Sequence, residues 1–240
     1  MQAKIAAAGI VALLFPAFAG AQDAKEALQQ KVAAFKESMA RNQAALRQYS
    51  WTAHTEISLK GEVKKTTDDI CRYGPDGKVQ KTPVGAPAPP KEQPQGRGRR
   101  GGAMKERIVE KKTDEMQDYM ERAVALIHNY VPPTPDRIQA AVQAGNVSAG
   151  PSGPDQVQLR FSNYLKPGDS LVLTLDPAAK TLRQVAVESY LDDQKDAVDL
   201  KVDFATLSDG PNYVAATTLN APAKKIQVVT RNGNYQRTAQ

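Results

Sequence analysis

The chain has 240 residues, 41% of them hydrophobic, and a formal net charge of +6, a composition that can form the core of an ordinary globular domain. With one cysteine, Cys71, and two histidines, His54 and His128, it can form neither an intrachain disulfide nor a zinc site built on several Cys or His ligands. Residues 91–112 hold eight basic and three acidic residues and so account for most of the positive charge. Because this charge is not spread over a face, no nucleic-acid partner is predicted.

Residues 1–21 have the features of a cleavable signal peptide. Lys4 precedes an apolar run from Ile5 to Phe18, and Ala19-Gly20-Ala21 has the small-residue pattern of a cleavage site. The pattern predicts a periplasmic protein that begins at Gln22, with an uncleaved N-terminal anchor as the alternative. No later run approaches the roughly 20 apolar residues of a membrane-spanning helix, so no transmembrane segment is expected. Residues 22–240 are predicted to form a single α+β domain.

The next part of the chain changes from a helical to a strand period. Apolar residues at helical spacing predict a helix over residues 23–48. Alternation from Tyr49 predicts a half-buried strand at 49–59 with His54 facing solvent. Turn residues then separate two more predicted strands, 63–73 and 78–82, and Cys71 is expected to be a buried, inert thiol.

Residues 83–102 contain five prolines and five glycines, which prevents a regular helix or strand and predicts a flexible insertion. Its arginines Arg97, Arg99 and Arg100 are a candidate site for an anionic partner, such as lipid headgroups, lipopolysaccharide or another protein. A solvated loop without a partner is the alternative.

A short strand at 105–110 and a pair of helices are predicted to follow. Thr113 suits the N-cap of the first helix, which Pro132-Pro133 ends, and His128 lies near that end. Thr134 and Pro135 suit the N-cap and first position of the second helix, and Gly145 suits its C-terminus.

The remainder of the chain is predicted to be a series of antiparallel strands. Their connections are too short for crossover helices. The strands are predicted at 157–164, 170–176, 182–190, 198–207, 212–220 and 225–232. Residues 171–175 and 185–187 are apolar or weakly polar on both faces, which favours a strongly curved antiparallel sheet, an unclosed β-barrel, packed against the N-terminal helix and the central helix pair.

Few residues suggest catalysis. The chain lacks a nucleophile elbow, a Cys-His signature and a phosphate-binding glycine motif. The acidic residues between Asp192 and Asp199 lack the spacing of a calcium loop and are expected to form a polar hairpin tip. We therefore expect a non-enzymatic protein without a cofactor or metal, although carboxylates that pair only in the fold leave an enzyme open.

Two regions resemble the LolA/LolB-like periplasmic fold of lipoprotein carriers and lipid-sensing regulators. Near the N-terminus, Phe35-Lys36-Glu37 and the run from Leu46 to Thr52 look like that family's amphipathic helix and first strand. Closer to the C-terminus, the runs 173–177, 182–185, 202–204 and 207–210 resemble its closing hairpins. The resemblance implies an unclosed β-barrel covered by helices, with an apolar cavity for acyl chains.

These observations predict an exported protein that holds a hydrophobic or acylated ligand between the sheet and its helices. The candidate ligand-binding residues are the apolar residues Trp51, Ile57, Leu173, Leu175, Val185, Val187 and Phe204. Burial of apolar ligand surface would supply the binding energy. The alternative is an envelope protein-protein interaction or stress-sensing module without a small ligand.

Overall fold

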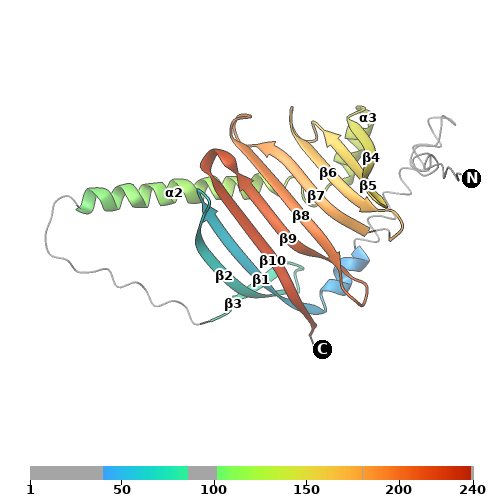
Figure 1. Ribbon diagram of the computed structural model, residues 1–240, viewed down its shortest axis with the longest axis horizontal. Coiled ribbons are helices and arrows are strands. Elements are labelled where there is room, and N and C mark those ends of the chain that lie inside the picture. The colour runs from blue at the N-terminus through green and yellow to red at the C-terminus, as the bar shows by residue number, and fades with distance from the viewer. Residues whose placement is uncertain (1–39, 86–101, 180, 239–240) are drawn as a thin grey trace, which may run out of the picture.

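A ten-stranded antiparallel sheet with helices on one face makes up the computed structural model, which describes residues 40–85, 102–179 and 181–238 (Figure 1). The strand order is β3-β2-β1-β10-β9-β8-β7-β6-β5-β4. The last strand, β10, therefore lies between β1 and β9 and connects the N-terminal strands to the C-terminal ones. The strands are β1 (Tyr49–Leu59), β2 (Glu62–Tyr73), β3 (Val79–Pro83), β4 (Val147–Gly153), β5 (Gln156–Ser162), β6 (Ser170–Asp176), β7 (Thr181–Tyr190), β8 (Ala197–Thr206), β9 (Asn212–Ala221) and β10 (Ile226–Arg237). The helices are α2 (Gly102–Ile127), α3 (Pro135–Gln143) and the short η2 (Pro222–Lys224).

The predicted α+β class and the antiparallel pairing are confirmed, and nine strands lie within a few residues of their predicted positions. Of the predicted helix at 23–48, only residues from 40 on are described, and 40–46 are helical. The Asn42 side chain donates to the carbonyl of Asn212 at 2.6 Å and accepts from its amide at 2.7 Å, which fixes this segment to the start of β9. Arg97, Arg99 and Arg100 lie outside the described residues.

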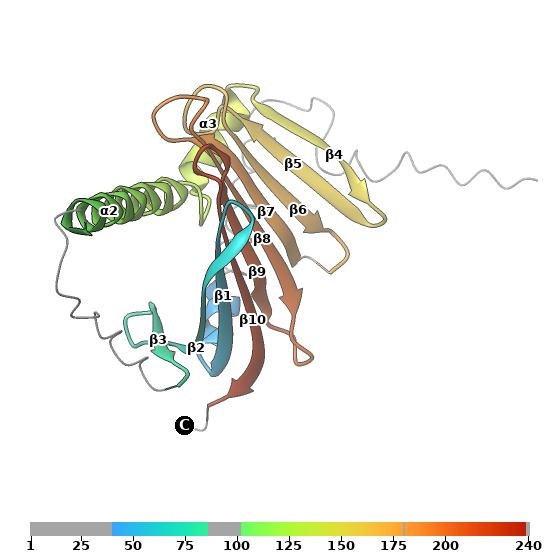
Figure 2. The same ribbon diagram turned by 60° about the vertical axis from the view of Figure 1, so that its left-hand side comes forward.

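The predicted strong curvature is wrong: the sheet is open and is neither closed nor strongly curled (Figure 2). The prediction rested on apolar residues on both faces of β6. Val172 lies on the face away from the helices, yet is only 4% exposed. Its cross-strand neighbour Arg160 reaches over β6 to Ser170 and Glu188. Burial of an apolar residue on the outer face, beside a long side chain, is therefore compatible with an open sheet.

The predicted strand at 105–110 is also wrong, because these residues belong to α2, which begins at Gly102 and not at Thr113. Four of the six residues of the segment are Lys, Arg or Glu, which favour a helix. The second predicted helix is confirmed as α3. Thr134 has the extended N-cap conformation, and Pro135 occupies the first turn.

Strand β4 is an element that the sequence pattern did not predict. Its sequence, VSAGPSG, contains two glycines and a proline and has no alternation of large apolar residues. It lies at the edge of the sheet and pairs with β5 alone. A proline is tolerated at an edge, because one side of the strand needs no backbone donor.

The helices cover one face of the sheet, which we call the inner face; the opposite face is the outer face. Ala123 and Ile127 of α2 and Ala141 of α3 pack on inner-face residues that include Phe161, Leu171 and Val187. These residues form the main core.

A buried polar cluster connects the helix pair to the sheet. The Tyr130 hydroxyl, fully buried, donates to Asp169 at 2.5 Å and lies 2.7 Å from the Ser189 hydroxyl. Asp169 is 2% exposed and also accepts the amides of Leu165 and Lys166. Burial raises the pKa of Tyr130, so the hydroxyl remains protonated and able to donate.

Candidate functional site

Two rows of side chains run across the inner face, one residue per strand from β2 to β4. Cross-strand pairing connects the members of each row. The first row is Lys65, Ile57, Val228, Leu219, Leu200, Val187, Leu171, Phe161 and Val147. The second row is Thr67, Thr55, Thr230, Thr217, Val202, Val185, Leu173, Leu159 and Ala149.

Burial falls along both rows toward β2. In the first row, Leu171 is 0% and Val187 is 1% exposed, Leu219 is 8% exposed, and Val228 and Ile57 are only half-buried. In the second row, residues from Leu173 to Val202 are buried and all four threonines are half-buried. In these two rows the residues of β6–β8 are buried, whereas those of β10, β1 and β2 are half-buried or exposed. Elsewhere on β1 and β2 the inner face is buried, at Trp51, Ala53 and Cys71.

The name open half-face is used below for the half-buried residues of these rows on β9, β10, β1 and β2. They are Ile57, Val228, Thr55, Thr230, Thr217 and Thr67. Helix α2 crosses above it, at the strand ends, where Tyr119 packs with Ala221 and Ile226 (Figure 2). Val228 also packs against this cluster, so α2 borders the open half-face on that side. The open half-face is therefore a half-buried surface of methyl and methylene groups next to a closed core.

Two of the four threonines of the open half-face satisfy each other's hydroxyl groups. The Thr55 and Thr230 hydroxyls lie 3.0 Å apart and hydrogen bond to each other across β1 and β10. Their hydrogen-bonding capacity is thereby partly used within the sheet. Lys65 is exposed and ends the first row at β2, so an ammonium group lies beside the open half-face.

The seven predicted ligand-binding residues divide into three groups. Leu173, Val185 and Val187 belong to the closed core, and each is at most 4% exposed. Ile57, Leu175 and Phe204 are half-buried, and only Ile57 lies on the open half-face. Trp51 is 7% exposed and stacks on Tyr235, with ring centroids 5.5 Å apart.

Sequence reasoning missed Val228 and the threonine row. The alternation in β10 contains the necessary signal, because Ile226, Val228 and Thr230 share a face. Threonine in a strand has no distinctive chemistry, however, and the alignment of four threonines depends on registers that the sequence does not specify.

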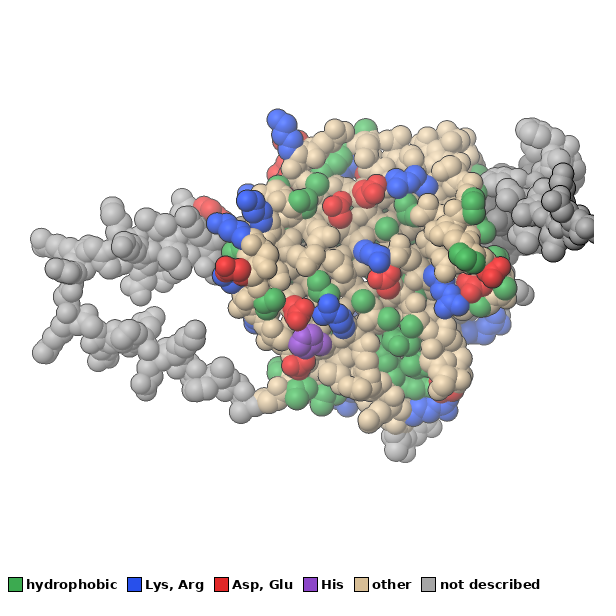
Figure 3. Space-filling model, viewed as in Figure 1, with side chains coloured by type: hydrophobic (Ala, Val, Ile, Leu, Met, Phe, Trp, Pro, Cys, Tyr) green, Lys and Arg blue, Asp and Glu red, His purple; other side chains and the backbone are tan. Residues whose placement is uncertain are grey.

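The outer face is polar and carries interspersed charges (Figure 3). Its ion pairs include Arg160 with Glu188 at 3.1 Å and Arg231 with Glu56 at 3.1 Å. His54 lies here, as predicted, with Nδ1 2.7 Å from Asp68 Oδ1 and Nε2 3.5 Å from Glu56. His128 follows the last residue of α2 and is exposed.

We predict that Asp68 controls the ionisation of His54. The hydrogen bond to Asp68 is the main cause that raises the pKa of His54 above its ordinary 6.5; burial opposes the shift, and Glu56 adds to it. Because the folded pKa is raised, the interaction stabilises the fold fully below about pH 6.5 and is lost as pH rises through the folded pKa. NMR titration of the ring should show a lower His54 pKa in Asp68→Asn than in the parent protein. An unchanged pKa would contradict this assignment.

Within the described residues, no three His, Cys, Asp or Glu side chains are grouped so that they could hold a metal ion. Cys71 is buried, as predicted, and burial raises the pKa of its thiol. None of the described helices is both long enough and apolar enough to span a membrane.

One solved structure is similar to this protein in fold. No protein family and no curated protein sequence matches the chain. The fold is similar to the crystal structure of a DUF1329 family protein from Desulfovibrio piger, with 10% sequence identity and a TM-score of 0.36. The match covers 86% of this chain and 92% of the other. The LolA/LolB-like resemblance is not tested directly by these comparisons.

Proposed function

We propose that the protein acts after export, in the periplasm, and binds a hydrophobic or acylated ligand on the open half-face without a covalent step. The observation that carries the proposal is the fall in burial along the two rows. The first row remains apolar as far as Ile57 while its cover ends near Leu219. An apolar surface that continues a core without cover is where a ligand gains most from burial.

An acyl chain is a suitable ligand for this surface. Each methylene that it buries against Ile57, Val228 and the threonine methyl groups contributes about 0.8 kcal/mol before ordering costs. The mutual hydrogen bond of Thr55 and Thr230 reduces the desolvation cost of covering the threonine row. Binding and release then require no chemical reaction.

A protein-protein interaction is the second candidate, and a different observation favours it. Four large hydrophobic residues of the β2–β3 region are strongly exposed: Val63 (56%), Ile70 (51%), Val79 (43%) and Val84 (53%). Ile70 pairs with Thr52 on the outer face and Val79 pairs with Tyr73 on the inner face, so both sides of this edge of the sheet expose apolar side chains. This region lies beside the open half-face, so a protein segment is an alternative occupant of the same part of the sheet.

Titration of delipidated protein with a fluorescent fatty acid tests the proposal. We expect saturable binding in the absence of vesicles. Ile57→Lys should weaken it at least tenfold, because the ammonium would have to lose water against the acyl chain.

Val229→Lys is the matched control for Ile57→Lys. Val229 is also half-buried but lies on the outer face, opposite Glu56 in the neighbouring strand. Its lysine variant should bind the probe like the parent protein, and both variants should keep the parent circular dichroism spectrum. Absence of saturable binding, or equal losses in both variants, would contradict the proposal.

A further inference from the structure

Two turns at one end of the sheet are joined by their backbones. Lys60 follows β1, and Lys225 precedes β10. The Lys60 amide donates to the Lys225 carbonyl at 2.8 Å. Both residues have left-handed backbones, with φ of 56° and 55°. Two lysines far apart in sequence are thus held side by side.

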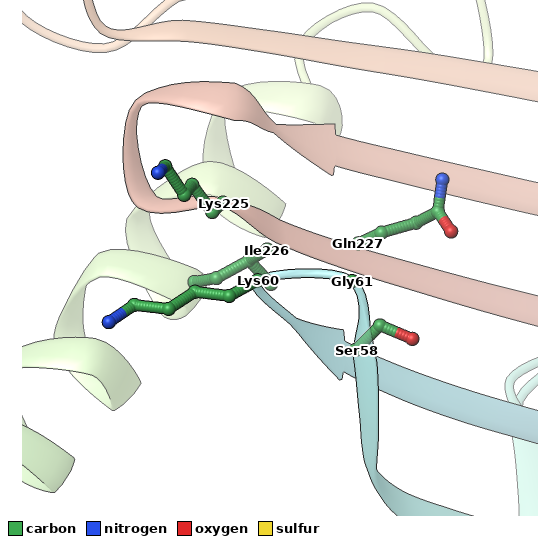
Figure 4. A pocket seen from close by; sticks show the side chains of 6 residues that line it. All are labelled: Ser58, Lys60, Gly61, Lys225, Ile226 and Gln227. Carbon is green, nitrogen blue, oxygen red and sulfur yellow. The ribbon is translucent and has the colours of Figure 1, made fainter.

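Their side chains extend from the paired turns toward the same end of the sheet, beyond the strands (Figure 4). They border a shallow hollow of about 450 Å³, open to solvent, that Ser58, Gly61, Ile226 and Gln227 also line. Within the described part of the chain, neither lysine forms an ion pair with a carboxylate. Their charges are therefore available to an external anion.

The surroundings of this lysine pair are mainly basic. Lys224 precedes Lys225, and its ammonium lies 5.3 Å from the centre of the Tyr119 ring. Lys65 is exposed, and Lys64 pairs with Glu62 and neutralises it. Asp196, in the β7–β8 turn, accepts the Tyr119 hydroxyl and keeps its negative charge, so Lys60, Lys225, Lys224 and Lys65 remain in excess.

We propose that this end of the sheet, the Lys60/Lys225 tip, docks the protein onto an anionic phospholipid bilayer. The hollow is open and the cations are spread over two turns, which fits a charged surface better than a single enclosed anion. Val63, 56% exposed in the adjoining strand, provides apolar surface for the interfacial region of the lipid. The tip lies at the strand ends, beside the part of the sheet that α2 crosses, so docking leaves the open half-face accessible.

Co-sedimentation with vesicles tests the proposal. The full mature protein should sediment with vesicles of phosphatidylglycerol and phosphatidylcholine in equal parts, but not with pure phosphatidylcholine. Added salt should weaken the binding, because the charges are exposed.

The double variant Lys60→Asn/Lys225→Asn should bind roughly 30-fold more weakly, the effect expected of two lysines at a lipid surface. Asparagine tolerates the left-handed backbone of both positions, so the fold should be preserved. Lys78→Asn/Lys81→Asn, with the same charge change in and after the β2–β3 turn, should bind vesicles like the parent protein.

Three results would overturn the docking proposal: no preference for anionic vesicles, unchanged binding by the double variant, or equal losses in both double variants. Displacement from vesicles by inorganic phosphate at constant ionic strength would also contradict it, because it would indicate a site for a single phosphate. The soluble fatty-acid titration separates this proposal from ligand binding, since Lys60→Asn/Lys225→Asn should bind that probe normally.

Discussion

Asp169→Ala should lower the free energy of unfolding by about 3–5 kcal/mol, one of the two largest effects that we expect from a single substitution. The substitution removes the acceptor of the buried Tyr130 hydroxyl and of the Leu165 and Lys166 amides. These donors would remain inside the protein with fewer partners, and the connection between the helix pair and the sheet would be lost. Urea denaturation monitored by circular dichroism measures the change.

Two conservative variants serve as controls for Asp169→Ala. Asp169→Asn keeps the side-chain volume and one acceptor oxygen, and Tyr130→Phe removes only the hydroxyl. Each should lower the free energy of unfolding by less than Asp169→Ala does. The double variant Tyr130→Phe/Asp169→Ala should lose less free energy of unfolding than the two single variants lose together, because the two groups share a hydrogen bond. Full additivity would contradict the coupling.

Leu173→Ala should lower the free energy of unfolding by about 3 kcal/mol, whereas Ile57→Ala should lower it by about 1 kcal/mol or less. Leu173 is 4% exposed in the closed core, so the substitution leaves a cavity. Ile57 is half-buried on the open half-face, and solvent fills the space that its side chain leaves. Denaturation of the two variants under identical conditions measures the difference.

The contrast between these two residues tests whether the inner face is divided into a closed core and the open half-face. A loss of 3 kcal/mol or more for Ile57→Ala would show that this part of the face is closed in solution. A small loss for Leu173→Ala would show that the main core is loosely packed. Either result would remove the structural basis of the ligand proposal.

Much of the fold could be predicted from local sequence chemistry. Alternation from Tyr49 gave β1 its correct limits, and the proline at position 135 marked the first turn of α3. Short turn-rich connections established the antiparallel pairing of the last strands. These features depend on residues close together in the chain, so their physical causes are visible in the sequence.

Three features of the fold were not predicted. Strand β4 exists because β5 offers it a partner, although its own residues are weak strand formers. Residues 105–110 continue α2, where their strong helix propensity outweighs a short apolar pattern. Val172 is buried on the outer face of an open sheet, where Arg160 of β5 hydrogen bonds to Ser170 of β6 and Glu188 of β7.

The candidate site was predicted only in part for a similar reason. The sequence indicated apolar strand faces, but not which part of a face the helices cover. Leu173 and Ile57 have similar patterns in their own strands, yet one lies in the core and the other on the open half-face. Cover depends on where α2 crosses the sheet, which no local pattern specifies.

Methyl NMR of the delipidated protein during titration with a fatty acid tests the central claim most directly. The account predicts saturable shift changes at the methyl groups of Ile57, Val228 and Thr230, with much smaller changes at Leu173 and Val187 in the closed core. Shift changes centred on Leu173 and Val187, or no saturable change at Ile57 and Val228, would contradict ligand binding on the open half-face.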